Sequence, residues 1–180
     1  HGIDGDFSLP SFGCVNDSVN VGLGTLDAPM SYIDTIFWDW GDGSPVDTTI
    51  GSSSVAPGLP PAHAYTTSGT YTVTATVSDS AYCPISLSHN ITITSPTANF
   101  NVDFLHICPG QGINAVDNST GTGAITSYSW SAPNANPTSS LNQNPGTFVF
   151  NNPGTYPITL SVTDVSGCID DTTINIDVYD

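Results

Sequence analysis

Residues 64–83 read AYTTSGTYTVTATVSDSAYC, and residues 149–168 read VFNNPGTYPITLSVTDVSGC. The two stretches align without a gap at a constant offset of 85 residues, so that both GTY triplets and both final cysteines coincide. Self-similarity at a fixed period is the signature of a repeated structural module. The sequence therefore predicts two copies of one module.

Apolar and polar residues alternate through both stretches, as they do at Tyr71, Val73, Ala75 and Val77 in the first copy. A period of two residues places one face of a strand in a core and the other face in water. The alternation continues in residues 91–94 and 174–178. Short strands of this kind, separated by turns rich in Gly, Pro and Asn, predict an all-β protein built from antiparallel β-sandwiches.

The repeat extends upstream of these strands. Phe7 and Cys14 correspond to Phe100 and Cys108, and Trp40 is matched to Trp130. The Thr94-Ser95-Pro96-Thr97 segment separates the copies and predicts two domains, residues 1–95 and 96–180. About 90 residues is the size of a small independent domain.

The composition excludes several classes of function. The 180 residues include no Lys or Arg and 16 acidic residues, all of them Asp, which gives a formal net charge of −16. Nucleic-acid binding and P-loop chemistry need cationic side chains, and the HExxH metalloprotease motif needs Glu. The hydrophobic share of 38% suffices for a packed core. No apolar run approaches the roughly 18 residues of a membrane helix, so membrane insertion is not expected.

Three separated motifs occur in order in the first copy: WDWGDG at residues 38–43, His63-Ala64-Tyr65, and GTYTV at residues 69–73. Together they resemble the signature of the PKD (polycystic kidney disease) domain. The second copy looks like a degenerate member, because Trp130-Ser131-Ala132-Pro133 replaces the WGDG turn and the His is missing. The resemblance implies tandem seven-stranded Ig-like sandwiches, usually extracellular, that serve as spacers or interaction modules.

Individual motif residues have expected structural roles. Trp40 and Trp130 are predicted to be core aromatics. Tyr71 and Tyr156 follow Gly at strand starts, as in a tyrosine corner, in which the hydroxyl bonds back to the backbone. His63 is expected to bond to nearby backbone.

The four cysteines occupy equivalent positions in the two copies. Equal modules should close equal bridges, so we predict one disulfide in each module, Cys14–Cys83 and Cys108–Cys168. Each bridge would add about 3–4 kcal/mol of stability by the chain-entropy estimate. Disulfides imply an oxidising compartment outside the cytoplasm. The alternative is a set of four buried free thiols.

Calcium is the cofactor that the sequence brings into consideration. Asp39, Asp42 and Asp47 cluster around the GDG turn, and calcium takes several oxygen ligands. No EF-hand loop is present, however, and the alternative is that these residues serve turns and solvation. No catalytic site is predicted, because the G-x-S-x-G nucleophile elbow does not occur.

Glycosylation is a further hypothesis. Asp followed by Ser or Thr and then an apolar residue or Thr resembles the O-glycosylation motif of secreted proteins in Bacteroidota. The candidate acceptors are Ser18, Thr35, Thr48, Ser80 and Thr172. The alternative is that these segments are Asp-initiated turns.

These features favour an extracellular structural and adhesive protein, in which tandem modules form part of a fibre on the cell surface. The modules resemble those of repetitive surface adhesins of gliding bacteria. The expected partners are further repeats or other copies of the chain, with surface glycans as a second possibility. Residues 1–9 and 172–179 are candidates for end-to-end contact or strand addition, unless they are ordinary first and last strands.

The alternative function is an accessory module pair of a secreted hydrolase that binds polysaccharide. Trp38, Trp40 and Tyr65 could stack on sugar rings if their side chains were exposed. A structural subunit should instead bury most of its aromatic residues. Exposure of these three side chains therefore discriminates between the two functions.

Overall fold

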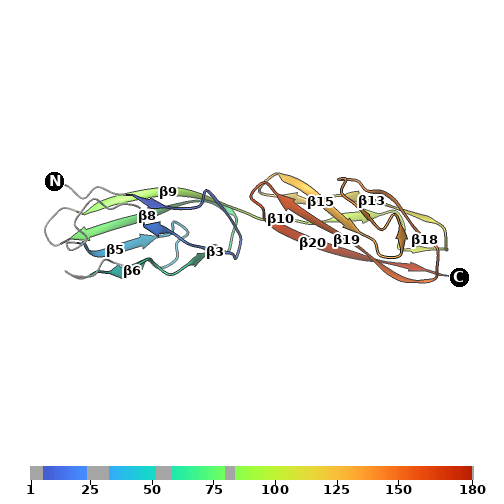
Figure 1. The fold of residues 1–180 in the computed structure, drawn as a ribbon, viewed down its shortest axis with the longest axis horizontal. Coiled ribbons are helices and arrows are strands. Elements are labelled where there is room, and N and C mark those ends of the chain that lie inside the picture. The colour runs from blue at the N-terminus through green and yellow to red at the C-terminus, as the bar shows by residue number, and fades with distance from the viewer. Residues whose placement is uncertain (1–5, 24–32, 52–57, 80–83, 180) are drawn as a thin grey trace. The chain divides into compact units, whose positions relative to one another are not determined.

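The computed structural model describes residues 6–23, 33–51, 58–79 and 84–179. Within this part of the chain every regular element is a strand, which confirms the predicted all-β class. The chain divides into two compact units, His1–Ile93 and Thr94–Asp180 (Figure 1). Each unit contains its own hydrophobic core. None of the described residues belongs to a helix with the length and hydropathy needed to cross a bilayer.

The described residues of unit 1 form the strands β1 to β9. A five-stranded sheet has the order β2-β9-β8-β5-β6, and two short antiparallel pairs, β1–β4 and β3–β7, complete the unit. The strands are β1 (Phe7–Ser8), β2 (Phe12–Cys14), β3 (Ser18–Val19), β4 (Gly22–Leu23), β5 (Ile33–Asp39), β6 (Asp47–Ile50), β7 (His63–Ala64), β8 (Gly69–Asp79) and β9 (Ile85–Thr94).

Unit 2 packs a five-stranded sheet, β12-β20-β19-β15-β17, against a four-stranded sheet, β11-β13-β18-β16, and adds the pair β10–β14. The short β12 runs parallel to β20, whereas the other pairs are antiparallel. The strands are β10 (Pro96–Thr97), β11 (Phe100–Val102), β12 (His106–Ile107), β13 (Gly112–Asp117), β14 (Thr120–Gly121), β15 (Ile125–Ser131), β16 (Ala135–Asn136), β17 (Ser139–Ser140), β18 (Gly146–Phe150), β19 (Gly154–Asp164) and β20 (Ile169–Val178).

The predicted period of two is present in the long strands β8 and β19. Val73, Ala75 and Val77 of β8 are all buried, and the intervening Thr residues face away from the core. Their counterparts in β19, which lie 85 residues later, are Ile158, Leu160 and Val162, and they are fully buried. The apolar alternation therefore determines which face of each long strand packs into the sandwich.

The match of Trp40 to Trp130 is wrong, because the strand register pairs Trp130 with a different tryptophan. Trp38 of β5 lies opposite Ala75, and Trp130 of β15 lies opposite Leu160, the counterpart of Ala75. The predicted core role of both Trp40 and Trp130 is confirmed, since each is 1% exposed.

Ring contacts give the same correspondence between the two cores. Phe7 contacts Trp38 edge-on with a centroid separation of 5.4 Å, and Phe100 contacts Trp130 edge-on at 5.0 Å. Tyr65 stacks on Tyr71, and Phe150, its counterpart, stacks on Tyr156. The two units therefore use the same aromatic contacts at equivalent positions.

The prediction of one disulfide per module is wrong for unit 2. Cys168 is disulfide-bonded, but Cys108 is free and exposed. Cys168 immediately precedes β20, whereas Cys108 follows β12, which pairs with the last two residues of β20. At about 3.3 Å per residue the two cysteines lie about 30 Å apart, far beyond the reach of a disulfide.

The structure does not have one disulfide in each module, so the predicted pairing is wrong for the chain as a whole. Cys14 is disulfide-bonded. Its predicted partner, Cys83, lies outside the described residues. The alternative of four free thiols is also wrong, since Cys14 and Cys168 are both in disulfides.

Candidate functional site

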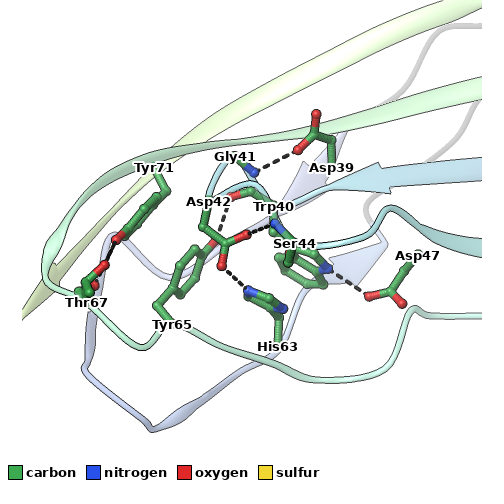
Figure 2. Close-up of polar contacts among 10 residues, drawn as sticks. All are labelled: Asp39, Trp40, Gly41, Asp42, Ser44, Asp47, His63, Tyr65, Thr67 and Tyr71. Carbon is green, nitrogen blue, oxygen red and sulfur yellow. Dashed lines mark hydrogen bonds and ion pairs between the residues drawn. The ribbon is translucent and has the colours of Figure 1, made fainter.

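The WDWGDG segment forms a tight turn after β5 that the two glycines make possible (Figure 2). Gly41 and Gly43 have φ values of 76° and 82°, which side-chain-bearing residues rarely adopt. A Cβ on Gly41 would also collide with the backbone carbonyl of Thr72. Asp39 Oδ1 accepts from the Gly41 N–H at 2.9 Å, and Asp42 Oδ1 accepts from the Ser44 N–H at 3.0 Å.

His63 of β7 contacts this turn through its ring and through one nitrogen. The imidazole stacks on Trp40 at 4.6 Å with an interplanar angle of 10°, and its Nε2 lies 2.8 Å from Asp42 Oδ2 (Figure 2). The expectation that His63 bonds to backbone is therefore wrong. The turn places a carboxylate, which is a stronger hydrogen-bond partner than a carbonyl, within reach of the ring.

Buried polar groups around Trp40 are satisfied by specific partners. The Trp40 Nε1–H donates to Asp47 Oδ2 at 2.8 Å. The Tyr65 hydroxyl donates to the Trp40 carbonyl at 3.1 Å, and burial raises the pKa of this phenol well above its usual range. These bonds join the turn, the start of β6 and the segment that follows β7.

The predicted tyrosine corners are both present. The Tyr71 hydroxyl donates to the Thr67 carbonyl at 2.9 Å, and the Tyr156 hydroxyl donates to the Pro153 carbonyl at 3.2 Å. Each bond ties the start of a long strand to the turn that precedes it (Figure 2 for Tyr71).

The Asp42 carboxyl group of this cluster is more acidic than an ordinary aspartate. Burial would raise its pKa, but hydrogen bonds from Ser44 and His63 outweigh burial and lower the pKa from 3.8 to about 2. Asp42 therefore stays ionised over nearly the whole accessible pH range.

The cluster lacks the geometry of a nucleophilic site. Asp42 Oδ1 accepts from the Ser44 backbone N–H and Asp42 Oδ2 lies 2.8 Å from His63 Nε2, so the carboxylate, and not the Ser44 hydroxyl, contacts the imidazole. A catalytic triad needs the imidazole between the other two groups. The Ser44 hydroxyl is also buried without a hydrogen-bond partner. The arrangement can fix the turn, and it places no activated nucleophile at the surface.

The three aspartates considered for calcium do not converge on one point. Asp39, Asp42 and Asp47 each accept from a different protein donor, namely the Gly41 N–H, the Ser44 N–H with His63, and the Trp40 indole. Calcium needs six to eight oxygen ligands around one centre. Among the described residues no group of three or more potential ligand side chains is positioned to hold a metal ion.

The residues expected to stack on sugars are inside the core. Trp38 and Tyr65 are 0% exposed and Trp40 is 1% exposed. Their faces pack against other rings of unit 1. The condition set for stacking on sugar rings, exposure of these three side chains, is therefore not met, because alternation and the glycine turn direct them inward.

The four candidate glycosylation sites that the structure describes lie on strands rather than on turns. Ser18 of β3 and Thr48 of β6 are exposed. Thr35 of β5 and Thr172 of β20 are half-buried, and Thr172 lies opposite the buried Leu160. Ser80 lies outside the described residues.

Comparisons with known proteins bear on both halves of the chain. The PKD domain model matches residues 8–95 and 93–178. No curated protein matches the chain.

Solved structures with a similar fold include two from Vibrio proteins. The PKD1 domain of Vibrio anguillarum Epp is 28% identical, covers 47% of this chain and 94% of its own, and gives a TM-score of 0.40. The PKD1 domain of the Vibrio cholerae metalloprotease PrtV is 29% identical, covers 48% and 99%, and gives 0.41. The fibronectin(III)-like modules of Clostridium thermocellum CbhA are 14% identical, cover 96% and 94%, and give 0.42.

Proposed function

Because this chain belongs to the PKD domain family along both of its halves, we propose that it is a non-catalytic structural and adhesive protein of the cell exterior. In this proposal the two modules form part of a cell-surface fibre or filament. Disulfide bonding of Cys14 and Cys168 agrees with an oxidising compartment.

The observation that carries the proposal is the shared construction of the two cores. Both units place a tryptophan at the same register position and stack an aromatic ring on the corner tyrosine. Units that repeat their packing but differ in their turns are suited to work as rigid spacers in series. The WGDG turn with its His–Asp pair belongs to unit 1 only. It therefore stabilises unit 1 locally and is not a feature that the two modules share.

The composition supports an exposed location. Without Lys or Arg the chain offers no cleavage site to trypsin-like proteases. It also cannot form isopeptide bonds through Lys, so its resistance must come from sheet packing and disulfides. Glycans on the exposed hydroxyls of Ser18 and Thr48 would add further protection, and an intact mass above that of the chain would reveal them.

The alternative function, a polysaccharide-binding accessory module, depended on exposed aromatic residues in the first copy. Its aromatic candidates are buried, and burial of most aromatic residues is what a spacer requires. The exposed aromatic residues among the described ones are instead distributed over both units, at Phe12, Phe37, Phe104 and Tyr179.

The structure also restricts which segments can make contacts between copies of the chain. Residues 172–178 belong to β20, which pairs with β19 along its whole length, so they form an ordinary last strand within unit 2. Asp170, Asp171 and Asp177 lie along the same strand, and like charges oppose strand addition by another acidic copy. Association at the end of unit 2, beyond Val178, remains in the proposal. Residues 1–5 lie outside the described part of the chain.

Negative-stain electron microscopy of native material tests the proposed function. Ordered fibres with a regular module repeat are the expected result. Isolated particles, together with retention of the chain on an insoluble glycan, would contradict it and favour the accessory-module alternative.

A further inference from the structure

Cys108 and Gln111 are the two ends of one tight turn that follows β12. The Gln111 N–H donates to the Cys108 carbonyl at 3.1 Å. Pro109 and Gly110 lie between them, and Gly110 has a φ of 82°, so both residues take the positions that they favour in a type II turn. The Gly110 N–H donates to the Phe150 carbonyl of β18 at 2.8 Å, which fixes the turn to another strand.

The side chain of Gln111 folds back toward Cys108. Its carboxamide oxygen Oε1 accepts from the Cys108 N–H at 3.4 Å, so the carboxamide lies over the backbone from which the thiol side chain departs. The Sγ atom is joined to that backbone through Cβ alone, and rotation about χ1 moves it relative to the carboxamide. The Cys108 thiol is free, and both residues are exposed. A nucleophile therefore lies beside a carboxamide carbon of the same turn.

Unit 1 contains the same turn without the reactive pair. The Asp17 N–H donates to the Cys14 carbonyl at 3.1 Å, and the Asn16 N–H donates to the Tyr65 carbonyl at 2.8 Å. Asn16 has a φ of 66°, as its glycine counterpart in unit 2 also has a positive φ. Unit 1 has a carboxylate, Asp17, where unit 2 has the carboxamide of Gln111, and its cysteine is disulfide-bonded. The free thiol and the carboxamide therefore occur together, and in unit 2.

We propose that Cys108 and Gln111 form an internal thioester, and that this thioester acylates a lysine side chain of a different protein. The proposal rests on the proposed adhesive function and deepens it, because it makes attachment to that protein covalent.

Both steps exchange one acyl bond for another. The Cys108 thiolate attacks the Gln111 Cδ, the C–N bond breaks, and the nitrogen leaves as ammonia with the proton that the thiol gave up. The lysine amine then attacks the same Cδ, the C–S bond breaks, and the sulfur takes up the proton that the amine loses. The product is an amide between Gln111 and the lysine, with Cys108 again a thiol. No atom is oxidised or reduced.

The turn supplies the proximity that the first step needs. Thiols and amides react slowly when they meet by collision, whereas two groups held in a reactive geometry reach effective concentrations of about 10⁵ M or more. Ammonia diffuses away after it leaves, so the reverse reaction lacks its nucleophile. The same two groups placed on a flexible segment would gain neither advantage.

The composition of the chain determines which amines the thioester can reach. The 180 residues contain no Lys, so copies of the chain cannot acylate one another through lysine side chains. The formal net charge of −16 favours encounters with basic proteins, which are the proteins that present many lysines. The partner is therefore a lysine-rich protein and not a second copy of this chain.

The test is the mass of the full chain, purified without reductant, and of the peptide of residues 103–116 that an Asp-specific protease releases. We expect that peptide to lack the mass of one ammonia molecule and its thiol to resist iodoacetamide. Methylamine should add to Gln111 and release one thiol per chain. Cys108→Ser and Gln111→Glu should keep their full mass and take up no methylamine.

Two other results are informative. A parent chain with its full mass and a thiol that reacts with iodoacetamide would overturn the proposal. Conversion of Gln111 to Glu in the parent, and not in Cys108→Ser, would support it, because water has then hydrolysed the thioester.

A pair of glycine variants tests the role of the turn. Gly110 and Gly146 have φ values of 82° and 86°, and a Cβ at either position meets no atom within 4 Å. Alanine therefore strains the backbone equally at both positions. We expect Gly110→Ala to lose ammonia at least tenfold more slowly than Gly146→Ala. Equal rates would contradict a thioester that depends on the turn.

The acceptor is identified with two probes, biotinylated cadaverine as a primary amine and glycerol as a source of hydroxyl groups. We expect cadaverine to be joined to Gln111 in the parent and not in Cys108→Ser. Transfer to glycerol without transfer to cadaverine would overturn the assignment of an amine partner.

Microscopy separates this inference from the proposed function. Ordered fibres built from a parent chain that has its full mass would refute the thioester and retain the structural role. A parent chain that loses ammonia and takes up methylamine, yet forms only isolated particles, would retain the thioester and refute the fibre.

Discussion

Trp130 occupies in unit 2 the position that Trp38 occupies in unit 1, since the two residues face Ala75 and Leu160, which are 85 residues apart. Each indole also meets an edge-on phenylalanine from the start of its unit, Phe7 or Phe100. The position of Trp40 is held in unit 2 by Ala132, which is buried as well. Unit 1 therefore has a second large aromatic in its core that unit 2 lacks.

We expect Trp38→Ala and Trp130→Ala to destabilise their own units by a similar amount, about 3–5 kcal/mol each, because both indoles are fully buried. Hydrogen exchange followed by peptide mass would locate the effect. Trp38→Ala should raise exchange in β8 and leave β19 protected, and Trp130→Ala should do the opposite. Loss of protection in both units from either substitution would contradict independent cores.

The buried indole N–H of Trp40 has the Asp47 carboxylate as its hydrogen-bond acceptor. Asp47→Ala removes the acceptor at 2.8 Å and leaves a buried N–H without a partner, so we expect a loss of about 1–3 kcal/mol in unit 1. Asp47→Asn retains an acceptor oxygen and should cost less. Asp17→Asn, at an exposed site, controls for the relief of charge repulsion. Equal denaturation midpoints for Asp47→Ala and this control would argue against the bond.

The two tyrosine corners should contribute unequally to the free energy of unfolding. Tyr71→Phe loses a bond to the Thr67 carbonyl and a second contact, 2.8 Å, with the Thr67 hydroxyl. Tyr156→Phe loses a single bond of 3.2 Å to Pro153. We expect about 1 kcal/mol for Tyr71→Phe and less for Tyr156→Phe, measured by urea unfolding of the full chain. A larger effect at Tyr156 would contradict this ranking.

Local patterns in the sequence predicted the fold and part of the site. Alternation identified the buried face of β8 and β19, and a tyrosine that follows Gly at a strand start was enough to predict both corners. These predictions succeeded because each depends on neighbours within a few residues in the chain.

Predictions that needed distances across the fold failed. Trp130 was matched to Trp40 because loop lengths differ between the copies, so that spacing alone could not separate Trp38 from Trp40. The pairing of Cys108 with Cys168 assumed that equivalent positions are also close positions, but a ten-residue strand separates them. The acceptor of His63 could not be predicted either, because Asp42 is brought to it by the turn.

Acid should remove the contribution of Asp42 to the stability of unit 1. Its pKa is about 2 in the folded state against an ordinary value of 3.8, so the ionised form is favoured by folding. The stabilisation is therefore complete above about pH 4 and is lost as the pH falls toward 2. Because the side chain is in part solvated, we expect Asp42→Ala to cost only about 1 kcal/mol at pH 6.

The measurement is the difference in urea midpoint between the parent and Asp42→Ala from pH 6 down to pH 2. The difference should shrink as the parent carboxylate becomes protonated, and Asp17→Asn measured in parallel corrects for the general loss of charge repulsion. A difference that is constant over this range would mean that Asp42 acts by packing alone. In that case the bonds from Ser44 and His63 to the carboxylate would not stabilise the turn.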